Sequence, residues 1–96
     1  MLDRRNDIMN RAKYIVVEQP FGKIGMEGEC IHVFPGMIDH REVFECLKKY
    51  YGENKVTLIS AGFIREGQTC GHSETLKIES RSDDQILYNI MIGESI

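Results

Sequence analysis

The sequence predicts an α/β protein of the α+β type, with a single mixed β-sheet and about two helices. Two apolar, β-branched runs, at 13–19 and 55–60, are typical of strands. Between them, residues 39–52 carry the apolar spacing and the end signals of a helix. A shorter helical pattern near the C-terminus predicts the second helix.

Length and composition indicate one domain, residues 12–96, preceded by a flexible tail, residues 1–11. A net charge of −3 gives no basic footprint, so nucleic acid is not an expected partner. No apolar run is long enough to cross a bilayer, and no signal peptide opens the chain. Three cysteines, an odd count, fit reduced thiols, and the expected location is the cytoplasm.

The N-terminal half predicts a hairpin. Its first strand ends at Pro20, and glycines punctuate a turn or loose tip over 21–28. The second strand, 29–34, stops at Pro35.

The following helix has a clear start and end. Asp39 is a good N-cap, Glu42 can complete a capping box, and Gly52 is a natural stop. Its apolar face is expected to comprise Val43, Phe44, Leu47, Tyr50 and Tyr51.

A buried strand follows this helix, so strand, helix and strand form a βαβ crossover. Small residues at 60–62 read as the exit from that strand, although 63–67 could continue it into a turn. Residues 68–78 alternate and predict a further strand. After it, a short helix ending at Gly93 is favoured, with a closing strand as the alternative.

His40 is the first candidate for chemistry, because it opens the helix. Its ring lies near the positive end of the helix dipole, which disfavours the imidazolium and leaves a neutral base. The free amides of the same helix end attract phosphate. The alternative is an exposed first-turn histidine without a task.

A second candidate is the run from Gly71 to Thr75. Gly71 allows close approach of a ligand, and the hydroxyl and amide groups of Ser73 and Thr75 could form an oxyanion cradle. Gly62 marks a strand end of the kind near which α/β proteins bind ligands. The alternatives are an ordinary strand with polar outward positions and plain packing beneath the helix.

Zinc is a further alternative. Cys30 with His32, and Cys70 with His72, form two Cys-x-His pairs on expected strands. Residues two apart on a strand share a face, so four ligands could meet if those strands were neighbours.

Four motifs, in this order, resemble the Janus/Ocnus family of small phosphohistidine phosphatases. They are the Lys-Tyr-aliphatic-aliphatic start of the first strand at 13–16, the helix-opening histidine at 40–44, the glycine-containing run at 60–64, and the phosphate-binding strand at 70–73. The resemblance spans about residues 12–78.

The resemblance implies roles for individual residues. His40 would act as general base, Ser73 and Thr75 would bind phosphate, and Lys13 would supply positive charge. Gly62 and Gly71 would give room. The substrate would be a phosphorylated protein or a small phosphorylated molecule, hydrolysed with no metal and no cofactor.

One departure is important. Phe63 stands where the family has arginine, and Arg65 or Arg81 would have to replace it. A non-catalytic anion-binding or protein-interaction domain is therefore the alternative function. Exposed sheet edges make a homodimer the expected assembly in that case.

Overall fold

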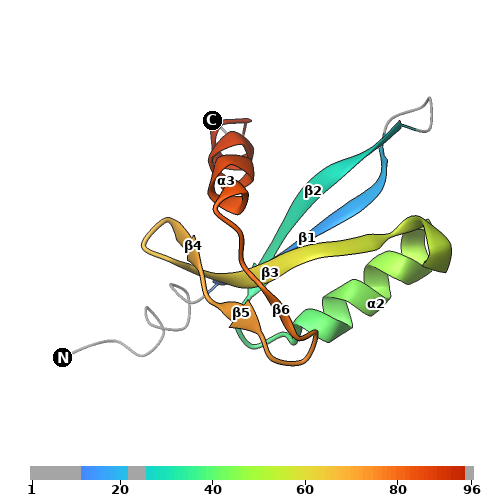
Figure 1. Cartoon of the computed structure of the whole chain (residues 1–96), viewed down its shortest axis with the longest axis horizontal. Helices are drawn as coiled ribbons and strands as arrows, with labels where there is room; N and C mark the ends of the chain where they lie inside the picture. Colours follow the sequence, from blue (N-terminus) through green and yellow to red (C-terminus); the bar gives the residue numbers. More distant parts are fainter. Residues whose placement is uncertain (1–11, 22–25, 95–96) are drawn as a thin grey trace.

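The centre of the molecule is a four-stranded antiparallel sheet, seen in the computed structural model in Figure 1. The structure describes residues 12–21 and 26–94, so the expected N-terminal tail lies outside the described residues. The strand order is β2-β1-β3-β4. The four strands are β1 (Ala12–Phe21), β2 (Met26–Pro35), β3 (Thr57–Arg65) and β4 (Gln68–Cys70). The expected α+β class is confirmed, with every ladder of this sheet antiparallel.

The hairpin is longer than the sequence suggested. β1 continues past Pro20 to Phe21, and β2 begins at Met26 and extends to Pro35. The expected turn over 21–28 is therefore too wide, because pairing continues to Phe21 opposite Met26.

A crossover through α2 (His40–Tyr51) joins β2 to β3. Because β2 and β3 each pair antiparallel with β1, they run parallel to one another with β1 between them. The expected strand–helix–strand crossover is thus confirmed. A short 3-10 turn, η1 (Glu53–Lys55), leads from α2 into β3.

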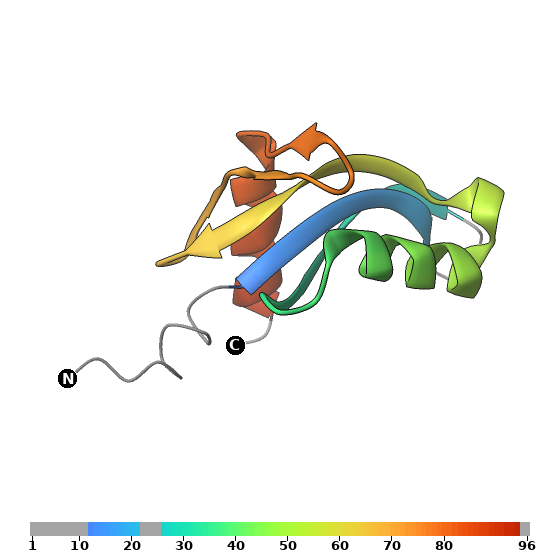
Figure 2. The ribbon, with the colours of Figure 1, turned by 90° about the horizontal axis from the view of Figure 1, so that it is seen from below.

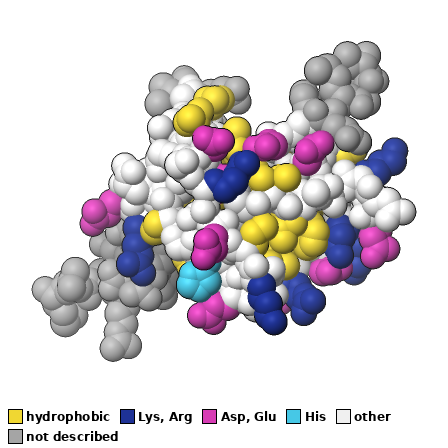
Figure 3. Space-filling model, viewed as in Figure 1, with side chains coloured by type: hydrophobic (Ala, Val, Ile, Leu, Met, Phe, Trp, Pro, Cys, Tyr) yellow, Lys and Arg dark blue, Asp and Glu magenta, His cyan; other side chains and the backbone are white. Residues whose placement is uncertain are grey.

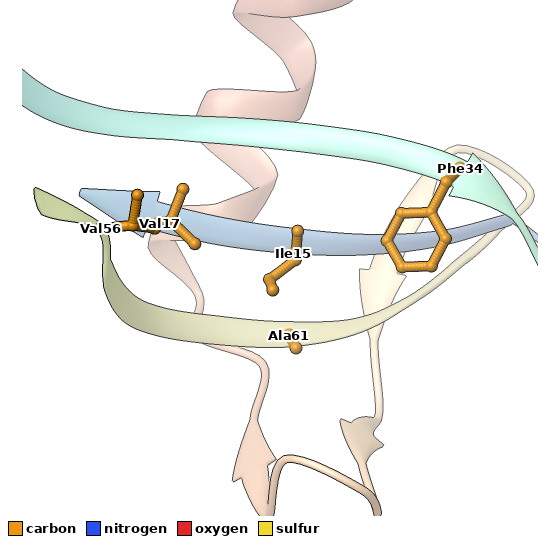
Figure 4. Close-up of a cluster of buried hydrophobic side chains, with 5 residues drawn as sticks. All are labelled: Ile15, Val17, Phe34, Val56 and Ala61. Carbon is orange, nitrogen blue, oxygen red and sulfur yellow. The ribbon is translucent and has the colours of Figure 1, made fainter. Parts of the chain in front are cut away.

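The core lies on both faces of β1, whose residues Tyr14 to Val17 are fully buried. Ile15 and Val17 cluster with Phe34, Val56 and Ala61, and side chains of α2 pack against this cluster. Figure 4 shows the five clustered side chains. Tyr14 and Val16 point to the other side, where α3 (Asp83–Glu94) covers them. Figure 2 shows the two helices on opposite faces of the sheet. Alternation along one central strand therefore serves two cores.

The ends of α2 follow the sequence signals. The carboxylate of Asp39 accepts a hydrogen bond from the Arg41 amide, at 3.2 Å between Oδ1 and N. Gly52 adopts φ +111° and its N–H donates to the Lys48 carbonyl. The capping-box contact expected from the Glu42 side chain does not occur among the described residues.

One face of α2 packs against the sheet as expected, through Val43, Phe44, Leu47 and Tyr51. Tyr50 was expected on that face, and this is wrong, since it is 81% exposed. In the last turn Tyr51 takes the position against the core, and the Tyr50 ring forms a T-shaped pair with it, with centroids 4.8 Å apart.

β3 continues to Arg65, with a turn at Glu66 and Gly67, so the strand follows the alternative in which 63–67 extend it into a turn. The stretch after β3 differs from the sequence expectation. The single strand expected over 68–78 is broken into β4, β5 (His72–Ser73) and β6 (Ile78–Glu79). Gly71 at φ +79° ends β4, and Lys77 at φ +55° shapes the turn between β5 and β6.

The C-terminal element is a helix, α3, and not the alternative strand. Asp84 in its first turn is fully buried and fastens it to the sheet. Its carboxylate accepts hydrogen bonds from the Tyr14 hydroxyl at 2.6 Å and the Ser60 hydroxyl at 2.8 Å. The backbone N–H and the Nε–H of Arg81 donate to the same group. Burial and the Asp84 contact raise the pKa of Tyr14.

Neither helix in the described part of the chain combines the length and apolar character needed to span a membrane.

Candidate functional site

A hollow of about 390 Å³ opens between the start of α2, the end of β3 and the turn after β5. It brings together Lys13, His40 and Thr75, three residues that the sequence singled out from separate segments. The full set of lining residues is Lys13, Met37, Asp39, His40, Phe63, His72, Glu74 and Thr75. The hollow therefore brings together three of the six site residues that the sequence predicted.

His40 is the first residue of α2 and forms the inner wall of the hollow. Its side chain is buried, with 3% exposure, and its Nε2 lies 2.9 Å from the Gly62 carbonyl oxygen. A carbonyl can only accept, so Nε2 carries the proton, and in the neutral ring Nδ1 is the basic nitrogen. The rings of Phe34 and Phe63 meet the imidazole edge-on from two sides, at 5.5 and 5.7 Å between centroids. The ring is thus fixed in one tautomer and one orientation.

The surroundings keep this imidazole neutral. Burial lowers the pKa of His40 below its ordinary value, because a charged ring would lose its hydration. The hydrogen bond to the Gly62 carbonyl opposes this shift, and the nearby Lys13 charge adds to it. A neutral imidazole is the form that can accept a proton.

Lys13 comes from β1, and its ammonium group lies at the start of α2. Its Nζ donates to the Ile38 carbonyl oxygen at 3.0 Å. An ammonium has three N–H groups, so two remain for other acceptors. The hollow therefore has a fixed positive charge beside the positive end of a helix dipole.

Asp39 and Thr75 join the two sides of the hollow. The Thr75 hydroxyl donates to Asp39 Oδ1 at 2.6 Å, across the gap between the β5–β6 turn and the helix start. The same carboxylate caps α2 through the Arg41 amide. The bond from Thr75, and then that from Arg41, lower the pKa of Asp39.

Three other expected site residues lie outside the lining of the hollow. Ser73 is 1% exposed, and its hydroxyl accepts the Leu76 amide at 3.2 Å, which closes the turn. Gly71 lies against Phe63, where an added Cβ would come within 2.8 Å of Cδ2 of that ring. Gly62 is in the middle of β3, not at its end, and contributes the carbonyl that orients His40.

The charge around the hollow is mixed, a feature that the sequence motifs did not indicate. One lysine faces two carboxylates, those of Asp39 and Glu74. His72 Nε2 lies 3.9 Å from a Glu74 oxygen, and both side chains are largely exposed. Figure 3 shows a histidine with acidic side chains beside it near the base of this face. A ligand with negative charge must therefore use the inner part of the hollow, near Lys13.

No arginine lines the hollow among the described residues. Arg81 is bound to Glu29 at 2.8 Å and to Asp84, and Arg65 is exposed at the end of β3. The aromatic ring of Phe63 occupies the wall instead.

The four-ligand zinc hypothesis is wrong. Cys30 and His32 are in β2, and Cys70 is in β4; these are the two opposite edges of the sheet, separated by β1 and β3. His32 is instead paired with Gln19, at 2.6 Å between Nε2 and Oε1. Among residues 12–21 and 26–94, no three cysteine, histidine or acidic side chains are close enough to hold a metal ion.

Comparison with known proteins adds nothing to this geometry. No protein-family model, no curated protein and no solved structure matches the chain.

Proposed function

We propose that this chain is a phosphohistidine phosphatase-like protein that binds a phosphoryl group in the hollow and uses His40 as its general base. One observation carries the proposal: a buried imidazole at a helix start lines the same hollow as Lys13 and Thr75. Positioning and electrostatic stabilisation are most of what phosphoryl transfer requires of a protein. The proposal includes no metal and no cofactor, and it places the protein in the cytoplasm.

The chemistry assigned to these groups is a hydrolysis. Lys13 and the Arg41 amide at the α2 N-terminus hold the phosphoryl oxygens, the amide after it releases the Asp39 carboxylate. Nδ1 of His40 takes a proton from a water molecule as that water forms a bond to phosphorus. The P–N bond of the phosphohistidine breaks, the leaving nitrogen receives a proton from solvent, and His40 returns its own proton to solvent. General-base help of this kind contributes roughly 10²–10⁴-fold.

The test is turnover of a phosphohistidine peptide, followed by ³¹P NMR, for the wild type, His40→Asn and His72→Asn. His72 is the matched control, because it lines the same hollow but is exposed. We expect His40→Asn to lose at least about 100-fold in rate and His72→Asn to retain activity. Equal rates for the wild type and folded His40→Asn would refute the catalytic role.

The hydrogen bonds of two hydroxyl groups favour a second, non-catalytic function. The hydroxyls of Ser73 and Thr75 already have partners within the chain, and Phe63 lines the hollow in place of a cationic side chain. These contacts suit a domain that binds a phosphorylated protein without hydrolysing it. Saturable binding of the phosphohistidine peptide with no release of phosphate would select this function.

The non-catalytic alternative includes association of two copies through a sheet edge. Sedimentation over a range of concentrations tests it directly. A monomer at all concentrations would remove the homodimer from the proposal.

A further inference from the structure

The side chain of Asp39 occupies the place in the hollow that an anionic ligand would need. Its Oδ1 accepts from the Thr75 hydroxyl at 2.6 Å and from the Arg41 amide at 3.2 Å. Lys13 is close enough for its charge to act on this carboxylate. The two donors, the Thr75 hydroxyl and the Arg41 amide, and the charge of Lys13 are also what an anionic ligand in the hollow would contact. A carboxylate of the chain itself is therefore bound where the ligand's oxygens would bind.

Two negative groups cannot share these donors without cost. An incoming anion meets Coulomb repulsion from Asp39 and finds the hydroxyl of Thr75 and the amide of Arg41 already engaged. The carboxylate must move aside or give up its hydrogen bonds before the anion can use them. The ligand then has to offer more than the carboxylate it displaces, in charge or in number of acceptor oxygens.

We infer that Asp39 is a specificity-determining residue: it acts as an internal anion that only a doubly charged, tetrahedral group displaces from the hollow. This inference rests on the proposed function, because it concerns the same hollow. A phosphoryl dianion has three free oxygens and a charge near −2 at neutral pH. A carboxylate ligand has no advantage over Asp39 in either respect. The hollow therefore admits phosphoryl groups and rejects singly charged organic anions.

The experiment measures binding of inorganic phosphate and of acetate to the full chain by amide NMR titration. The key variant is Asp39→Asn, because asparagine is as good an N-cap as aspartate and removes only the charge. Glu42→Gln is the matched control; it removes a charge from the same helix turn, but Glu42 does not line the hollow. Asp39→Ser serves as a second variant that preserves the cap if Asp39→Asn does not fold.

We expect Asp39→Asn to bind phosphate about tenfold more tightly than the wild type, equivalent to about 1.4 kcal/mol, and to bind acetate measurably. Glu42→Gln should remain within about twofold of the wild type for phosphate, because an exposed charge outside the hollow is largely screened. Unchanged or weaker phosphate binding by folded Asp39→Asn and Asp39→Ser would overturn the inference.

The same titrations separate this inference from the proposed function. If the wild type binds phosphate and the Asp39 variants bind it no better, the inference fails while the anion site stands. If neither the wild type nor any variant binds phosphate, the hollow is not an anion site and both fail. If Asp39→Asn binds phosphate tightly but the wild type does not hydrolyse the phosphohistidine peptide, the inference holds and only catalysis is refuted.

Discussion

The Nε2 atom of His40 and the carbonyl oxygen of Gly62 are hydrogen-bonded at 2.9 Å, joining the first residue of α2 to the middle of β3. This contact fixes which nitrogen of the imidazole is basic. It also gives a polar partner to a ring that is otherwise enclosed by two phenylalanines. The same bond therefore serves stability and the proposed chemistry.

The burial of His40 predicts a loss of stability in mild acid. Its pKa is lowered in the folded chain, so the unfolded chain binds the proton more readily. The stabilisation is complete above the ordinary histidine pKa of 6.5 and is lost as the pH falls from there towards the folded-state pKa. Urea unfolding between pH 7.5 and 5 should show this decline in the free energy of unfolding.

A matched pair of variants tests whether His40 causes this decline in the free energy of unfolding. His40→Gln should make the curve flatter over the same range, and His72→Gln, at an exposed histidine, is the control substitution. His32, whose pKa is also lowered by burial, accounts for the slope that remains. An identical slope in the wild type and His40→Gln would contradict the assignment.

Asp84 is expected to be the residue whose loss is most destabilising. Asp84→Ala leaves the Tyr14 and Ser60 hydroxyls and the Nε–H of Arg81 without their acceptor. Removing one partner of a buried charged network costs about 3–5 kcal/mol. Asp83→Ala removes the exposed neighbouring carboxylate and should cost less than about 1 kcal/mol. Denaturant unfolding of both variants checks the difference, and equal losses would contradict the network's role.

Gly62 is expected to tolerate no side chain. A Cβ there would collide with the Cys70 carbonyl oxygen, where β4 approaches β3. Gly62→Ala should therefore destabilise the chain by about 1–3 kcal/mol. Gly93→Ala, in α3 with open space around it, should instead stabilise by about 0.4–1 kcal/mol. Thermal unfolding distinguishes the two, and a neutral Gly62→Ala would show that β4 can move away.

We expect Ser73 to contribute to stability and Lys13 to contribute to phosphate binding, although the sequence motifs predicted that both residues bind phosphate. Ser73→Ala removes the acceptor for the Leu76 amide and should cost about 1–2 kcal/mol of stability. Its effect on phosphate affinity should be small, because Ser73 does not line the hollow. Lys13→Met should weaken phosphate binding at low salt with little change in stability. Phosphate titrations and urea unfolding on both variants would reveal the opposite pattern if Ser73 were the ligand-binding residue.

The sequence predicted the elements whose signals are local. Asp39 before an apolar helical repeat and Gly52 after it place α2, because caps act within one turn. The β-branched run at 13–17 predicts β1, and alternation along it serves two cores. Lys13, His40 and Thr75 could be proposed together only because their motifs occur in a family-like order. Nothing local showed that Asp39 would face them.

Tertiary structure alone decided which polar groups are free and which are already used. Asp84 reads as an ordinary helix-start residue, and its main partner, Tyr14, is 70 positions away in the sequence. Ser73 looks like a ligand-binding hydroxyl, but it is buried and accepts the amide of Leu76, three positions further along. The spacing of Cys30 and Cys70 from their neighbouring histidines suggested a shared zinc site, but the strand order places the two cysteines on opposite edges of the sheet. Residue type and spacing determine helices, strands and their ends, because these signals act within a few residues. Only the packing of distant segments determines which partner each hydrogen-bonding group and each charge contacts.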